Sequence, residues 1–292
     1  MKEKVGFIGL GNIGEPMAEN LVRKGFDIIV YDVRKEPLDA LQKLGARVAT
    51  SPKEVGEVSN FVIVMVRDRA QAEEVILAEN GILAGAREGS IVIISSTLEP
   101  SFCQQVAKTA AAKGVGVIDA PVTGGMAGRA ATGMLTLMVG GEQQLVDKSR
   151  PVLEAIGNNI FHIGGIGTGQ IVKLANNMIS LSSYLATTEA IALAVKGGVD
   201  FERLLEVIRT GSGSTYAAQG QTWISWYRLK SGTPDHLNIT YKDANLALKV
   251  SKDLGLDLYH QEAVTALDIT KILKNIPREK IGSEGDTKPK SH

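Results

Sequence analysis

The 292-residue sequence has no excess of charge of either sign, since 32 lysine and arginine residues balance 32 aspartate and glutamate residues. A chain without net charge lacks the basic surface that binds nucleic acids, so we expect no nucleic-acid partner. Long apolar runs are also missing: none is longer than Phe61–Val66, which is far shorter than the ~18 residues that a membrane span needs. No signal-peptide core precedes the first strand-like run, so we expect a cytoplasmic protein with no membrane association.

Cysteine is nearly absent, because Cys103 is the one cysteine in the chain. This excludes an intrachain disulfide framework and a cysteine-rich zinc site, and it fits a reducing compartment. Cys103 lies in the helix-like stretch Ser101–Lys113 with no histidine nearby in the sequence, so we expect a structural role for it. Histidines are scarce and show no ligand spacing, so we expect no metal; they are His162, His236, His260 and His292.

Apolar residues make up 44% of the chain and charged residues 22%, as in ordinary globular proteins, and the length predicts about two domains. In the first half, β-branched runs alternate with amphipathic segments. The expected strands are Val5–Leu10, Asp27–Asp32, Phe61–Val66, Ser90–Ser95, Gly116–Ala120, Leu135–Val139 and Asn159–Ile163. The expected helices include Glu15–Lys24, Pro37–Leu44, Ala70–Ile76 and Pro100–Lys113. This alternation predicts an α/β fold with a doubly wound, largely parallel sheet covered by helices on both faces.

The second half changes character. From Thr168 to Lys196 nothing interrupts a helix, and Gly197 and Gly198 supply the stop. A helix of this length is roughly 45 Å long. Beyond it we expect only helices, at Asp200–Arg209, Tyr216–Lys230, Lys242–Leu254 and Gln261–Leu273. We therefore place an α/β domain at residues 1–163 and an all-helical domain at residues 164–292, with a loose polar tail from about residue 277.

The sequence from Gly9 to Gly14 has the pattern Gly-x-Gly-x-x-Gly, directly after a predicted strand and at the start of a predicted helix. In that context the pattern is the fingerprint of a Rossmann-type dinucleotide-binding domain. Gly9 permits the tight turn, Gly11 lets the backbone approach a pyrophosphate, and Gly14 lets helix and strand pack closely. Asn12 and Ile13 offer unpaired N–H groups to the phosphates at the helix start.

Asp32 ends the second predicted strand, 18 residues after Gly14. A carboxylate at this point accepts hydrogen bonds from the adenosine ribose hydroxyls and repels a 2′-phosphate, which favours NAD. Arg34 lies two residues further on and could pair with a 2′-phosphate, so NADP stays possible; alternatively, Arg34 is a solvated surface charge.

Four polar residues of the long predicted helix fall on one stripe: Lys173, Asn177, Ser180 and Tyr184. A lysine that faces an apolar, closed cleft loses solvation, and its pKa falls toward the working pH. Lys173 could then move a proton to or from a substrate oxygen, with Asn177 one turn away as its helper. The alternative is a stripe that faces solvent.

At these residues the chain resembles a known family. Four motifs match in order, at Gly6–Gly14, Asp119–Gly125, Gly169–Asn177 and Lys242–Leu248. Together they are similar to the β-hydroxyacid dehydrogenases, which include 3-hydroxyisobutyrate dehydrogenase and tartronate semialdehyde reductase and are related to 6-phosphogluconate dehydrogenase. The resemblance extends over the chain to about Leu273.

The resemblance implies roles for particular residues. Lys173 would be the general acid/base, and Asn177 would assist it at the substrate. Thr123, Gly124 and Gly125 would bind the substrate carboxylate through hydroxyl and N–H groups. The family usually has serine where this chain has Thr123, and the extra methyl group narrows the pocket.

The resemblance also implies cofactor contacts. Thr97 would lie near the nicotinamide, unless it simply caps the next helix. Lys242 would reach the cofactor or the mouth of the active site, unless it is a helix-surface charge. Val66 and Arg67 stand where the family usually has Leu-Pro; Arg67 would meet an anionic group or be a loop charge. Asp119 is expected to be a structural hydrogen-bonding residue at a strand end.

These observations predict an NAD-preferring oxidoreductase that interconverts a small 3-hydroxy acid and its semialdehyde. Its second domain would bind the carboxylate-bearing substrate and form a homodimer or homotetramer. One alternative is an imine reductase on the same scaffold, although those relatives usually lack a lysine at the position of Lys173. Another is a dinucleotide-binding module without catalysis. A serine hydrolase is disfavoured because Gly211–Ser214 falls among helix-like segments, with no nucleophile elbow after a strand.

Overall fold

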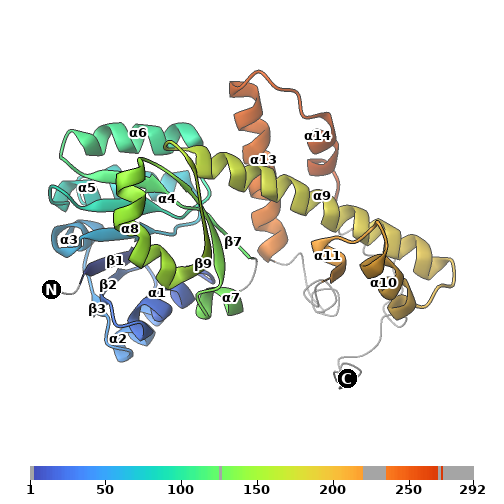
Figure 1. The fold of residues 1–292 in the computed structure, drawn as a ribbon, viewed down its shortest axis with the longest axis horizontal. Helices are drawn as coiled ribbons and strands as arrows, with labels where there is room; N and C mark the ends of the chain where they lie inside the picture. The colour runs from blue at the N-terminus through green and yellow to red at the C-terminus, as the bar shows by residue number, and fades with distance from the viewer. Residues whose placement is uncertain (1–2, 125–126, 220–234, 269–270, 272–292) are drawn as a thin grey trace. The chain divides into compact units, whose positions relative to one another are not determined.

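A computed structural model describes residues 3–124, 127–219, 235–268 and 271 of the chain (Figure 1). The chain divides into two compact units, Met1–Lys173 and Leu174–His292. The long helix α9 (Thr168–Lys196) belongs to both units, because the division falls within its second turn. Its bounds are those that the sequence predicts.

The first unit contains a sheet in the order β3-β2-β1-β4-β5-β6-β8-β7, with β9 paired to β8. All pairs from β3 to β6 are parallel, whereas β8 runs antiparallel to β6 and β7. The strands are β1 (Lys4–Ile8), β2 (Asp27–Tyr31), β3 (Arg47–Val48), β4 (Phe61–Val64), β5 (Ile91–Ile94), β6 (Gly116–Asp119), β7 (Val122–Thr123), β8 (Leu135–Gly140) and β9 (Gly157–Gly164). The predicted largely parallel sheet is confirmed. The sequence analysis missed β3 and β7, which are too short to show an alternating pattern.

Successive residues of the central strands are buried on opposite faces of the sheet. Phe61 and Ile63 of β4 join one core cluster, which also includes residues of α1 and α8. Val62 and Val64 join a second cluster with residues of α4 and α6. Burial of both faces explains why these strands are continuous apolar runs in the sequence.

Eight helices accompany this sheet within the described residues. They are α1 (Gly14–Arg23), α2 (Lys35–Lys43), α3 (Pro52–Val58), α4 (Arg69–Leu77), α5 (Ile82–Gly85), α6 (Pro100–Ala111), α7 (Ala127–Ala131) and α8 (Gln143–Ile156). Polar side chains start two of them: Ser51 accepts a hydrogen bond from the Glu54 N–H at α3, and Asp68 accepts one from the Gln71 N–H at α4. The cap on α4 fixes the loop that follows β4.

The second unit is helical in its described part, as predicted. It continues α9 and adds α10 (Phe201–Thr210), α11 (Tyr216–Gln219), α13 (Asp235–Asp253) and α14 (Tyr259–Thr265). Two predicted bounds were wrong: α13 begins before Lys242, and α14 ends before Leu273. The end of the predicted helix Tyr216–Lys230 and the predicted tail lie outside the described residues. Leu181, Leu185 and Phe201 belong to the core of this unit.

Helix α9 is unusually apolar. Of the helices in the described part of the chain, it alone is long and apolar enough to cross a membrane. Of its most apolar stretch of 18 residues, 39% is buried. Core helices of proteins that work in water meet the same criterion, so this composition is weak evidence for a membrane.

Candidate active site

The Gly-x-Gly-x-x-Gly segment forms the turn between β1 and α1. Gly9 has a φ of 95°, in the left-handed region that favours glycine. A side chain at Gly14 would collide with the carbonyl oxygen of Gly9, which is why the helix can follow the turn so closely. These are the conformational roles that the sequence predicts for both glycines.

The start of α1 is suited to an anionic group. A Cβ atom added at Gly11 would have no other atom within 4 Å. Ile13, the N-cap residue, gives no side-chain hydrogen bond to the helix, and Asn12 is exposed. N–H groups at a helix start without a side-chain cap attract phosphates. This turn therefore fits the pyrophosphate of a dinucleotide.

Asp32 follows β2 and is held beside the glycine turn. Its Oδ2 accepts a hydrogen bond from the Leu10 N–H over 2.6 Å, and its Oδ1 accepts one from the Arg34 N–H over 2.8 Å. Burial alone would raise the pKa of Asp32. The hydrogen bonds from the Arg34 side chain and from both N–H groups outweigh burial and hold the pKa below its ordinary value. The carboxylate therefore stays charged where a ribose would bind.

Arg34 is more constrained than a solvated surface charge. Its Nε lies 3.1 Å from Asp32 Oδ1, and its Nη2 donates to the Leu10 carbonyl over 2.6 Å. The hydrogen bond to Asp32 raises the pKa of Arg34. In this arrangement the guanidinium partly neutralises the carboxylate that would select NAD.

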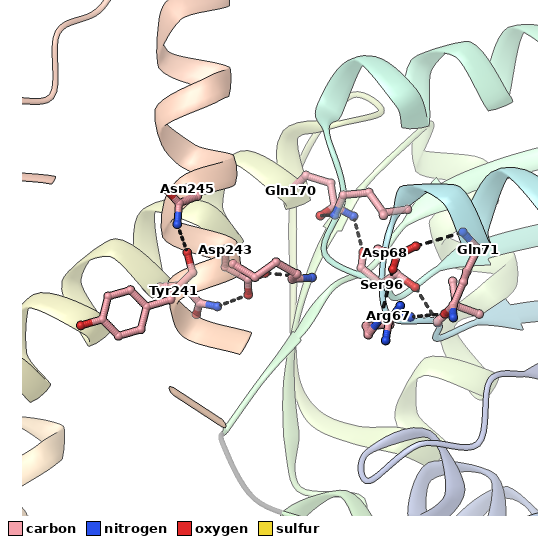
Figure 2. A network of polar contacts seen from close by, with 12 residues as sticks. Arg67, Asp68, Gln71, Ser96, Gln170, Tyr241, Asp243 and Asn245 are labelled. Atoms are coloured by element: carbon pink, nitrogen blue, oxygen red, sulfur yellow. Dashed lines mark hydrogen bonds and ion pairs between the residues drawn. The ribbon is translucent and has the colours of Figure 1, made fainter. Parts of the chain in front are cut away.

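The loop after β4 is joined to the loop after β5. The Val66 N–H donates to the Ser96 hydroxyl over 2.8 Å. Next to it, the Arg67 N–H donates to Gln71 Oε1 over 3.0 Å, and Arg67 Nε lies 3.1 Å from Asp68 Oδ2 (Figure 2). The exposed Arg67 side chain thus has a local carboxylate partner in the loop.

Thr97 lies in the loop between β5 and α6 and is half-buried. The N-cap residue of α6 is Glu99, so Thr97 does not cap that helix. The backbone on both sides of Thr97 is held by one side chain: Gln170 Nε2 donates to the Ser96 carbonyl over 2.9 Å, and Gln170 Oε1 accepts from the Leu98 N–H over 3.0 Å. The sequence analysis did not single out Gln170, although it lies within the motif Gly169–Asn177.

Asp119 ends β6 and holds the start of α9. Its Oδ1 accepts from the Gly167 N–H over 2.6 Å, and its Oδ2 accepts from the Gln170 N–H over 2.8 Å. The predicted structural role at a strand end is therefore confirmed. Burial raises the pKa of Asp119 to about 6, although these N–H groups act in the opposite direction.

Thr123 and Gly124 lie where β7 ends. Thr123 is half-buried and pairs with Thr136 of β8. Gly124 has a φ of 122°, and an added Cβ would first meet Arg129 at 3.6 Å. Gly125, the third residue predicted to bind a carboxylate, lies outside the described residues.

The polar stripe on α9 does not face solvent. Lys173 is half-buried, Asn177 is 8% exposed and Tyr184 is buried. Burial raises the pKa of Tyr184 to about 12, so its hydroxyl stays protonated at neutral pH. The alternative of a solvent-facing stripe is therefore wrong for Asn177 and Tyr184, and Tyr184 packs in the core of the second unit.

Asn177 contacts a carboxylate that the sequence analysis missed. Its Nδ2 donates to Asp243 Oδ2 over 2.6 Å, and its Oδ1 accepts from Asn176 Nδ2 over 3.0 Å. Lys242 Nζ lies 3.1 Å from Oδ1 of the same carboxylate. The signal for Asp243 was its position in the motif Lys242–Leu248, directly after the lysine.

Cys103 is fully buried on α6. Burial raises the pKa of its thiol well above the ordinary value, with a smaller opposing effect from a hydrogen bond with Gln170. The expected structural role agrees with this environment, since a buried neutral thiol is a poor nucleophile.

The parallel sheet, the glycine turn and the carboxylate after β2 define a Rossmann-type dinucleotide-binding domain, followed by a helical domain. Comparison with known families agrees over nearly the whole chain. Residues 4–164 match the NAD-binding domain of 6-phosphogluconate dehydrogenase, and residues 167–274 match the NAD-binding domain of NADP-dependent 3-hydroxyisobutyrate dehydrogenase. The chain belongs to the 3-hydroxyisobutyrate dehydrogenase family of NAD(P)-dependent hydroxyacid dehydrogenases.

Named relatives cover most of the chain. Mitochondrial 3-hydroxyisobutyrate dehydrogenase of Mus musculus is 38% identical over 87% of this chain and 75% of that protein. The NAD-dependent L-serine dehydrogenase of Pseudomonas aeruginosa is 36% identical over 90% of this chain and 86% of that protein. These similarities support an NAD(P)-dependent hydroxyacid dehydrogenase.

Solved structures show the same fold. The 3-hydroxyisobutyrate dehydrogenase of Mycobacterium tuberculosis with L-serine has a TM-score of 0.78 and 28% identity, covering 94% of this chain and 99% of that chain. The imine reductase of Myxococcus stipitatus with NADP+ has a TM-score of 0.67 and 18% identity, covering 93% of this chain and 94% of that chain. The second similarity shows a common fold alone.

Proposed function

We propose that this protein is an NAD-preferring dehydrogenase that interconverts a small 3-hydroxy acid and its semialdehyde, with Lys173 as the general acid/base. The observation that carries the proposal is the position of Lys173. It lies on α9 one turn before the buried Asn177, and the start of that helix is held by Asp119 at the end of β6.

The names of the relatives support the substrate class. 3-Hydroxyisobutyrate and L-serine both carry a primary alcohol at C3, a carboxylate at C1 and a small group at C2. A substrate of this class needs a site for its carboxylate and a base for its hydroxyl. Thr123, Gly124 and Gly125 are proposed for the carboxylate, and Lys173 for the hydroxyl.

The cofactor would be held by groups already in place. N–H groups of the glycine turn at the start of α1 would bind the pyrophosphate, and Asp32 would accept hydrogen bonds from the ribose hydroxyls. Val66, Arg67 and Thr97 would contact the nicotinamide half. When bound, NAD supplies a hydride acceptor at C4 of its nicotinamide ring.

The proton moves separately from the hydride. Neutral Lys173 takes the proton of the substrate hydroxyl during oxidation, and protonated Lys173 returns it during reduction. Asn177 lies one turn further along the same face of α9. The bonds of its amide to Asp243 and Asn176 restrict its rotation, so it presents a fixed dipole beside the reacting oxygen.

We also propose that the protein is a homodimer or homotetramer. Three large apolar side chains of α9 are exposed, Ile171 by 40%, Ile179 by 72% and Leu193 by 78%. Apolar side chains exposed on a long helix are typical of surfaces that bind another subunit. Light scattering at micromolar concentration tests this proposal, and a monomer would contradict it.

A substrate panel tests the main proposal. We would assay 3-hydroxyisobutyrate, L-serine, glycerate, threonate and 3-hydroxybutyrate with NAD and with NADP. The primary alcohols 3-hydroxyisobutyrate, L-serine and glycerate should be oxidised, with higher kcat/KM for NAD. Failure to oxidise any of them with either cofactor would overturn the proposal, and reduction of cyclic imines instead would favour an imine reductase.

A further inference from the structure

Gln170 is a fully buried polar residue whose side chain has no role in the proposed chemistry so far. It lies in the first turn of α9 and has no exposed surface. Burial of an amide is costly unless its polar atoms are hydrogen-bonded, and both its oxygen and its nitrogen have backbone partners here.

Those partners lie on either side of a single residue. Gln170 Nε2 donates to the carbonyl of Ser96, and Gln170 Oε1 accepts from the N–H of Leu98. β5 ends at Ile94, so the segment around Thr97 lies beyond the end of the strand. The Gln170 amide bonds to the backbone of this segment as a neighbouring strand would. Thr97, between the two bonds, is the residue proposed to contact the nicotinamide half.

The same residue is connected to two further parts of the first unit. The backbone N–H of Gln170 donates to Asp119 at the end of β6. Ser96, which accepts from Gln170 through its carbonyl, also accepts from the Val66 N–H through its hydroxyl (Figure 2). The loops after β4 and β5 and the start of α9 are therefore joined through Gln170 and Ser96.

Lys173 lies three residues after Gln170 on α9, almost one turn further along. A displacement of the Gln170 amide would therefore change the position of Thr97 relative to the helix that carries Lys173. We propose that Gln170 is a positioning residue, which fixes Thr97 and the cofactor loops in register with Lys173. This inference rests on the proposed function, because it assigns Thr97 and Lys173 to the two reacting partners.

The first test is Gln170→Met, which keeps the length of the side chain but removes the hydrogen bonds to the Ser96 carbonyl and the Leu98 N–H. The matched control is Gln105→Met, at an exposed position of α6. Turnover of 3-hydroxyisobutyrate or L-serine is divided by the number of NADH sites found by fluorescence titration, so that unfolded molecules do not count. A small misplacement of reacting groups can cost up to about 100-fold, and we expect kcat per site to fall by about 10- to 100-fold, with KM within about threefold.

Unchanged kcat per site in Gln170→Met would overturn the proposal, as would an equal loss in the Gln105→Met control. Gln170→Glu provides a second test that a general loss of packing would not imitate. Ionised glutamate can accept from the Leu98 N–H but cannot donate to the Ser96 carbonyl, whereas protonated glutamate can do both. The ratio of wild-type kcat to Gln170→Glu kcat should therefore rise with pH, and a flat or falling ratio would contradict the role.

Hydrogen exchange separates this inference from the proposed function. The Leu98 N–H should be protected in the wild type and in Gln105→Met but should exchange at least about 10-fold faster in Gln170→Met. Equal protection in all three proteins would overturn the positioning role even if the enzyme is active. If the wild type oxidises no 3-hydroxy acid, the proposed function fails, and the positioning role in that reaction fails with it. Faster exchange of the Leu98 N–H in Gln170→Met would still show that Gln170 holds the loop.

Discussion

The side-chain amide of Asn177 donates a hydrogen bond to Asp243 Oδ2 over 2.6 Å, and Asp243 is only 1% exposed. A carboxylate buried to this degree needs partners. Its other oxygen, Oδ1, has the Lys242 ammonium 3.1 Å away as an ion-pair partner, but no well-aligned hydrogen bond among the described residues. The orientation of Asn177 therefore depends on the buried carboxylate of Asp243.

Asp243→Ala removes the acceptor for the Asn177 amide and leaves that buried donor unpaired. We expect a loss of about 1–3 kcal/mol in the free energy of unfolding and a fall in kcat of about 10-fold or more. Asp243→Asn keeps an acceptor oxygen and should retain more activity. Denaturant unfolding and steady-state kinetics measure both effects, with the exposed Asp253→Ala as the control. Wild-type turnover in Asp243→Ala would contradict this role.

Lys173→Ala tests the proton transfer itself. Loss of a general acid/base typically costs about 10²- to 10⁴-fold, and we expect kcat to fall within that range. Binding of NAD, followed by fluorescence titration, should be almost unchanged, because no cofactor-binding role is assigned to Lys173. Lys196→Ala, at the exposed end of the same helix, is the matched control. Turnover close to that of the wild type would remove Lys173 from the mechanism.

Asp32→Ala tests the cofactor preference. The substitution removes the carboxylate that repels a 2′-phosphate and releases the Arg34 guanidinium from its ion pair. We expect the ratio of kcat/KM for NADP to that for NAD to rise by at least about 10-fold. A tenfold change in this ratio corresponds to a change of only about 1.4 kcal/mol in the relative interaction free energy of the two cofactors. The control is Asp39→Ala, at an exposed position of α2. An unchanged ratio would show that Asp32 does not face the ribose.

Asp119 predicts a pH dependence of stability. Its pKa is raised from 3.8 to about 6 in the folded protein, so the folded state binds the proton more tightly than the unfolded state does. The contribution of Asp119 to stability is therefore fully present below its unfolded pKa of 3.8 and is lost as the pH rises through about 6. This rise in the pKa of Asp119 corresponds to about 3 kcal/mol in the free energy of unfolding.

The measurement compares the wild type with Asp119→Asn by denaturant unfolding at pH values from about 3.5 to about 7, in steps of about 0.5 pH unit. These values cover the range between the unfolded and folded pKa of Asp119. The stability of the wild type relative to Asp119→Asn should decrease as the pH rises across this window. The difference between the two proteins isolates Asp119 from other carboxylates, such as Asp32, whose lowered pKa acts in the opposite direction. A difference that does not vary with pH would contradict the raised pKa.

Local signals in the sequence predicted several parts of the fold correctly. The turn at Gly9–Gly14 and the bounds of α9 follow from glycines, apolar runs and helix-stopping residues within one segment of chain. The parallel sheet follows from strands that are apolar on both faces. The positions of Lys173 and Asn177 on one face of a helix follow from helical periodicity alone.

Other features depend on residues that meet only after the chain folds. Asn177 and Asp243 are 66 residues apart in the sequence, and Gln170 and Ser96 are 74 apart. No periodicity or local motif specifies which buried polar group will find which partner over such distances. The sequence by itself therefore determined the glycine turn and the helix that carries Lys173 and Asn177. Tertiary packing alone decided which carboxylate, amide and backbone groups hold them in place, because buried polar groups must pair with whatever the packed elements bring within reach.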